Sequence, residues 1–144
     1  FELTESDETL AYANLDNAIK AGKPWVGFCY TPHYVFVLHE MQVLEEPAYD
    51  ASKWKVVQPT DDPAWLDVST AGTAWDTAYL HLHYAKAIEK EQPEVAKLFR
   101  NMKLTTDQVS EMTYALVIDK KDPAAYAKDW VKNNEDAVLG WLTN

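Results

Sequence analysis

The predicted fold is decided by the stretch Lys23-Pro24-Trp25-Val26-Gly27-Phe28-Cys29-Tyr30-Thr31-Pro32-His33-Tyr34-Val35-Phe36. Residues 26–29 form a short apolar run without charge, which is typical of a strand buried on both faces. Thr31 and Pro32 then form a helix or turn start, because the hydroxyl can accept backbone N–H bonds and proline suits the first helical position. A buried strand that leads into a helix favours a mixed α/β fold.

Tyr30 and His33 follow the predicted strand at its carboxyl end, where open α/β sheets bind their ligands. We expect them at the edge of a crevice, beside free N–H groups able to bind an anion. A tyrosine ring attracts a quaternary ammonium cation, and a histidine with a helix start suits a carboxylate. The pattern therefore favours a small zwitterion as the ligand. The alternative is that Tyr30 and Tyr34 only pack, and that His33 is a surface residue at a helix start.

Composition narrows the classes of function. The 144 residues carry 47% hydrophobic side chains, enough for one ordinary domain or two small lobes. A formal net charge of −10 argues against nucleic acid or an anionic membrane surface as a partner. One cysteine, Cys29, excludes an internal disulfide and a multi-thiolate metal site. The sequence opens on Phe1 rather than Met, so we expect a processed or excised piece.

The first 85 residues predict a helix followed by short strands and an irregular connection. Apolar residues recur at helical spacing over about residues 6–21, and Gly22 supplies the stop. Residues 34–38 are continuously apolar and fit either a helix or a strand. Further predicted segments are short strands at 41–44 and 54–57, an irregular connection at 63–77 and a strand at 78–85.

Residues after 85 predict a cluster of helices. One follows Pro93 to Met102, one begins at the capping box Thr105-Thr106-Asp107-Gln108, one at Asp122-Pro123 and a short one at Asn134. The predicted secondary structure falls into two parts that meet near residues 65–77. The first part contains a helix and buried strands, and the second contains a strand and helices. The second half would cover one side of a sheet.

The sequence contains no motif of an enzyme or of a cofactor site. His81 and His83 would share a strand face and could chelate zinc, but two ligands do not make a site, so structural histidines are the preferred interpretation. The chain has no Gly-x-Ser-x-Gly elbow and no phosphate-binding glycine loop. We therefore expect neither catalysis nor a bound cofactor.

At Tyr30-Thr31-Pro32-His33-Tyr34 the chain resembles the substrate-binding proteins of ABC importers for glycine betaine, choline and related quaternary ammonium compounds. That family shows an aromatic residue, commonly Trp, then x-Pro-His-aromatic, after an apolar strand introduced by a Lys-Pro turn. The resemblance continues along nearly the whole chain: Leu44-Glu45-Glu46-Pro47, His81, Met102-Lys103-Leu104, Trp130 with Asn133, and Trp141.

The resemblance implies the type II periplasmic-binding-protein fold, a two-lobed Venus flytrap of the α/β class. Only the C-terminal half of such a protein would be present, and self-association of the fragment would complete it. Residues 1–65 would belong to one lobe, residues 66–77 would form the crossover, and residues 78–144 would return to the other lobe.

The resemblance also implies a function. The protein would capture glycine betaine, choline or a related osmolyte in an aromatic cage and deliver it to an ABC permease, on the periplasmic side or the outer face of the membrane. Tyr30, Thr31 and His33 would contact the ligand, and Tyr30 replaces the commoner Trp, so that cage wall is smaller. The isolated half would bind weakly. The alternative is a ligand-sensing or protein-interaction domain that reuses this fold.

Overall fold

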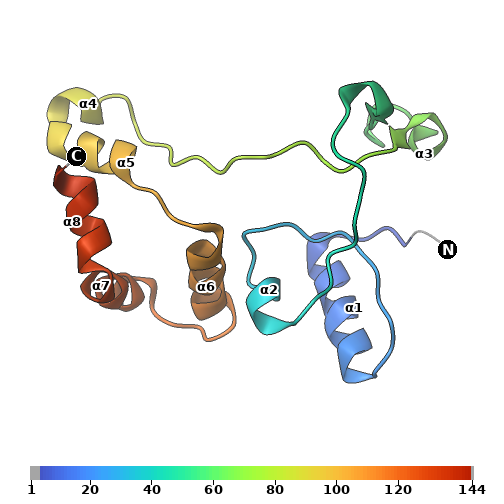
Figure 1. Ribbon diagram of the computed structural model, residues 1–144, viewed down its shortest axis with the longest axis horizontal. Coiled ribbons are helices and arrows are strands. Elements are labelled where there is room, and N and C mark those ends of the chain that lie inside the picture. Colours follow the sequence, from blue (N-terminus) through green and yellow to red (C-terminus); the bar gives the residue numbers. More distant parts are fainter. Residues whose placement is uncertain (1–3, 144) are drawn as a thin grey trace. The chain divides into compact units, whose positions relative to one another are not determined.

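The computed structural model describes residues 4–143. Over that range it contains eight α-helices, one 3-10 helix and two short strands (Figure 1). The chain forms two compact units. The first contains the described residues up to Met41 together with those from Lys86 onward, and the second spans Gln42–Ala85.

Helix α1 (Glu8–Lys20) confirms the helix predicted near residues 6–21. The carboxylate of Asp7 caps it by accepting a 2.8 Å hydrogen bond from the amide of Leu10. Gly22 follows the helix with φ of 62°, the left-handed conformation that favours glycine at a helix end. Tyr12 and Leu15 are buried on one side of the helix, so this side faces the core.

The core of the first unit lies between α1 and helix α2 (Val35–Leu38). Val35 is only 1% exposed and packs with Tyr12 and Leu15. Partly buried side chains surround these three: Trp25, Cys29, Tyr34, Phe36 and Met41. The apolar residues 34–38, which fit helix or strand by pattern, therefore form a helix whose first residue anchors the core.

The prediction of a buried strand at residues 26–29 is wrong. These residues are not in a strand, and Val26 and Phe28 are 72% and 59% exposed. A strand needs a neighbouring strand to satisfy its backbone N–H and C=O groups. Among the described residues the first unit contains no strand, so this segment has no sheet to join.

The strands predicted at residues 41–44 and 78–85 are also wrong, and for the same reason. Both segments lack regular secondary structure. Tyr79 and Leu80 are 74% and 78% exposed, whereas the predicted strand would have placed one of them against a core.

The second unit is built on a small sheet. Strand β1 (Trp54–Lys55) pairs antiparallel with β2 (Thr70–Ala71), with Trp54 opposite Ala71. The strand predicted at Trp54 is therefore confirmed over two residues. The unit also contains the 3-10 helix η1 (Ala51–Lys53) and helix α3 (Trp65–Val68), so the connection at 63–77 is less irregular than expected.

Five helices follow residue 85 in the described range, and the last four match the helices predicted there, whereas the first was not predicted. They are α4 (Ile88–Glu91), α5 (Pro93–Asn101), α6 (Thr106–Val117), α7 (Pro123–Asn133) and α8 (Glu135–Thr143). Thr105 and Gln108 form both hydrogen bonds of the expected capping box at the start of α6. Helix α6 packs against α2, and α8 packs against α5 and α7. Trp130 and Trp141 stack with their ring centres 5.9 Å apart, which joins α7 to α8.

Within residues 4–143, every helix is too short or too polar to cross a lipid bilayer.

Candidate functional site

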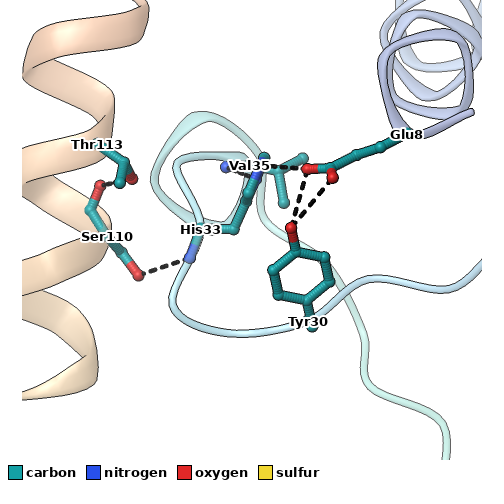
Figure 2. Close-up of polar contacts among 6 residues, drawn as sticks. All are labelled: Glu8, Tyr30, His33, Val35, Ser110 and Thr113. Atoms are coloured by element: carbon teal, nitrogen blue, oxygen red, sulfur yellow. Dashed lines mark hydrogen bonds and ion pairs between the residues drawn. The ribbon is translucent and has the colours of Figure 1, made fainter. Parts of the chain in front are cut away.

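The carboxylate of Glu8 joins the two residues that the sequence singled out (Figure 2). The Tyr30 hydroxyl lies 3.1 Å from both Glu8 oxygens and donates to them. The His33 Nε2 atom lies 3.1 Å from Glu8 Oε1. Glu8 stands in the first turn of α1, and Tyr30 and His33 stand in the segment that leads to α2. The structure thus brings Tyr30 and His33 together around one anion.

The hydrogen bonds of the His33 ring define its protonation pattern. The amide of Val35 donates to His33 Nδ1 at 3.2 Å, so Nδ1 is an acceptor and carries no hydrogen. A neutral imidazole then carries its hydrogen on Nε2, which donates to Glu8. The ring nitrogen able to donate to a carboxylate is therefore directed at Glu8 (Figure 2).

Ser110 on α6 holds the backbone of the same turn. The amide of His33 donates to Ser110 Oγ at 3.1 Å, and Ser110 Oγ donates to the Thr106 carbonyl at 2.9 Å. Ser110 is 5% exposed, so this bond lies away from water. Thr113 Oγ1 donates in turn to the Ser110 carbonyl. These bonds fix the His33 backbone to α6.

Two of the backbone amides near the expected anion site already have acceptors within the chain. Helix α2 begins at Val35, three residues after Pro32, and its N-cap is Tyr34. The amide of His33 donates to Ser110 Oγ, and the amide of Val35 donates to the His33 ring. Side chains of this chain therefore satisfy these two backbone donors.

Aromatic rings enclose most of the His33 imidazole. Its centre lies 4.2 Å from that of Tyr34, 4.6 Å from Tyr12 and 5.7 Å from Tyr30. The His33 side chain is accordingly 12% exposed, whereas Tyr30 is 45% exposed. The Tyr30 ring is thus open to a cation in solution, and His33 is a largely covered neighbour.

Burial and the nearby carboxylate both affect the tyrosines of this cluster. Partial burial, followed by the hydrogen bond to Glu8, raises the pKa of Tyr30, so its hydroxyl stays protonated and donates. Burial also raises the pKa of Tyr12 and of the Cys29 thiol. Cys29 is therefore poorly suited to act as a nucleophile at neutral pH.

Thr31 is exposed, and its peptide bond to Pro32 is cis. A cavity of about 190 Å³ in the first unit is lined by residues of α1 and α2, including Tyr12 and Tyr34, and by Ile118. Tyr30, Thr31 and His33 do not line it. Of the three, His33 contacts the cavity wall, because its ring packs against those of Tyr12 and Tyr34.

The other histidines belong to different surroundings. His39 Nε2 lies 2.6 Å from Asp16 Oδ1, and this hydrogen bond lowers the pKa of Asp16. The rings of His81 and His83 in the second unit are 6.3 Å apart. Across residues 4–143, no group of three or more His, Cys, Asp or Glu side chains is arranged to hold a metal ion.

Sequence reasoning missed Glu8 and Ser110. Glu8 lies 22 residues from Tyr30, and Ser110 lies 77 residues from His33. Glu8 has the pattern of an ordinary acidic residue in a first helical turn, and Ser110 that of a helix residue. A local pattern contains no signal that would pair either residue with the Pro-His turn.

Comparison with known proteins adds the family. Residues 1–133 match the substrate-binding domain of the ABC-type glycine betaine transport system. The chain is similar to the glycine betaine/carnitine transport binding protein GbuC of Listeria monocytogenes, with 25% identity over 141 residues. That alignment covers 98% of this chain and 39% of the relative. The chain therefore spans about two fifths of the length of the curated relative that it matches.

Proposed function

The chain belongs to the family of substrate-binding domains of ABC-type glycine betaine transport systems, and from this premise we propose that it forms part of the solute-binding component of such an importer. The family has the type II periplasmic-binding-protein fold. Its members bind a solute rather than transform it. We assign this chain the same role: it captures glycine betaine or a related quaternary ammonium compound for an ABC permease.

The observation that supports the proposal is the exposed face of Tyr30 beside the His33 imidazole. Tyr30 is 45% exposed, and its ring centre is 5.7 Å from that of His33. An aromatic face binds a quaternary ammonium group through the ring quadrupole, worth about 0.5–2 kcal/mol for one ring. Thr31, exposed beside Tyr30, supplies a hydroxyl to the same ligand.

One aromatic ring is far from sufficient for tight binding. Micromolar affinity corresponds to roughly 8 kcal/mol, so further aromatic walls are required. In the proposal these walls come from the other half of the flytrap, the N-terminal one. Residues 1–65 and 78–144 contribute to different lobes, with residues 66–77 as the crossover. The site works on the extracytoplasmic side, where an importer collects its solute.

The test is a calorimetric titration of the complete protein that carries this chain with glycine betaine, choline and carnitine. Tyr30→Ala removes the ring, and we expect it to weaken binding by about three- to thirtyfold. Tyr30→Phe keeps the ring and should retain most of the affinity. Tyr79→Ala is the matched control, because Tyr79 is 74% exposed in the second unit.

Two results would contradict the proposal. One is the absence of saturable binding of all three ligands by the wild-type protein. The other is equal affinity of Tyr30→Ala and Tyr79→Ala, which would show that Tyr30 does not contact the ligand.

A second candidate function is supported by the exposed apolar side chains. Val26, Phe28, Tyr79 and Leu80 are each more than half exposed. Apolar groups in this number on extended segments favour contact with another protein chain. A ligand-sensing or protein-interaction domain would have such a surface, and a stable protein partner in the absence of osmolyte binding would favour it.

A further inference from the structure

We infer that Glu8 is a specificity-determining residue of this site, and that it favours quaternary ammonium ligands without a carboxylate, such as choline, over carboxylated ones, such as glycine betaine. The inference rests on the proposed function, since it concerns the ligand class of the same site. It starts from the position of the Glu8 carboxylate between the Tyr30 hydroxyl and His33 Nε2 (Figure 2).

Glu8 already accepts hydrogen bonds from two donors that a carboxylated ligand would use, the Tyr30 hydroxyl and His33 Nε2. In a betaine, the ammonium group would lie against the Tyr30 ring and the carboxylate would seek a nearby N–H or O–H group. The side-chain donors beside Tyr30 are its own hydroxyl, His33 Nε2–H and the exposed Thr31 hydroxyl, and the first two donate to Glu8 at 3.1 Å. The His33 amide donates to Ser110 instead. A ligand carboxylate that bonds to the Tyr30 hydroxyl or to His33 Nε2 must therefore compete with Glu8.

The charge of the Glu8 carboxylate also disfavours a carboxylated ligand. The Glu8 side chain is 51% exposed, so its carboxylate is in contact with water. Its negative charge attracts the ammonium group of any ligand at Tyr30 and repels a second carboxylate. Within residues 4–143, the ion pairs formed by lysine and arginine side chains lie on other carboxylates, those of Asp16, Asp50, Glu89 and Asp119. Choline, which has a hydroxyl in place of a carboxylate, keeps the attraction and avoids the repulsion.

The substitution Glu8→Gln tests the inference, because glutamine keeps the size of the side chain and removes the charge. We expect the ratio of choline affinity to glycine betaine affinity to fall by about fivefold or more, given the size of interactions between partly exposed charges at contact distance. Glu5→Gln is the matched control: it makes the same change in net charge three residues earlier in the chain. Both variants are titrated in the complete protein at one fixed ionic strength.

The outcomes separate the inference from the function on which it rests. A fall in the ratio for Glu8→Gln, and not for Glu5→Gln, supports the inference. Saturable binding of either ligand with the same ratio in wild type and both variants overturns it and leaves the proposed function standing. Absence of binding of both ligands by wild type and variants, with unchanged thermal unfolding, overturns the proposed function and the inference together.

Discussion

At the scale of single residues, the hydrogen bond between His39 and Asp16 gives stability a defined dependence on pH. The bond from His39 Nε2 is the main cause that lowers the pKa of Asp16 below its ordinary value of 3.8, and Lys20 acts in the same direction. Because the folded-state pKa is the lower one, the stabilisation is fully present above pH 3.8 and is lost as the pH falls through the folded value.

We therefore expect Asp16→Asn to lower the free energy of unfolding by up to about 1 kcal/mol at pH 7, since the Asp16 side chain is 35% exposed. At pH 2 the difference in stability between the variant and the wild type should be smaller than at pH 7. Urea unfolding at the two pH values measures both differences. A cost of Asp16→Asn that is the same at pH 7 and pH 2 would show that its charge is not the cause.

How far single residues could be predicted depended on distance along the chain. The turn at residues 30–33 is a local pattern, and the structure places Tyr30 and His33 side by side. The roles of Glu8 and Ser110 depend on contacts across 22 and 77 residues, which no local pattern contains. One of the amides expected to be free in the turn, that of His33, instead donates to this distant serine.

At the scale of elements, Asp7 governs the start of α1 and therefore the position of Glu8. Its side chain accepts from the Leu10 amide at 2.8 Å. We expect Asp7→Ala to cost about 1 kcal/mol of folding free energy, whereas Asp7→Asn keeps an N-cap acceptor and should cost little. Urea unfolding of both variants checks this. Equal losses would indicate that the charge of Asp7, rather than the cap, is responsible.

Ser110 connects two elements, α6 and the turn before α2. Ser110→Ala leaves the His33 amide without its acceptor in a buried place, at a cost of about 1–3 kcal/mol. Faster hydrogen exchange of the His33 amide is the direct measurement. Thr113→Ala is the control, because Thr113 donates to the Ser110 carbonyl and not to the turn. Unchanged His33 exchange in Ser110→Ala would contradict the role given to this serine.

Helices were predicted better than strands because their signals are local. The caps at Thr105 and Asp122 form where the sequence places these helix starts. The segments predicted as strands at 26–29, 41–44 and 78–85 have the expected apolar residues but pair with no strand among residues 4–143. A strand is completed by other strands, so its existence cannot be decided from its own residues.

At the scale of the whole molecule, the exposed apolar segments predict association. Val26 and Phe28 in the first unit, and Tyr79 and Leu80 in the second, expose apolar surface to water. We expect the 144-residue chain to self-associate at micromolar concentration, perceptible by light scattering as a mass above 16.4 kDa. Val26→Lys together with Leu80→Lys should reduce the mass toward the monomer. A monodisperse wild-type monomer would contradict the proposal.

The central claim is that a quaternary ammonium ligand binds at Tyr30 and His33, and ligand-dependent NMR of the histidine side chains tests it most directly. Glycine betaine added to the complete protein should shift the His33 Nε2 resonance in a saturable way, because the ligand displaces or approaches Glu8. The exposed His81 in the second unit should not respond. Saturable binding that leaves the His33 resonance unchanged would contradict the claim.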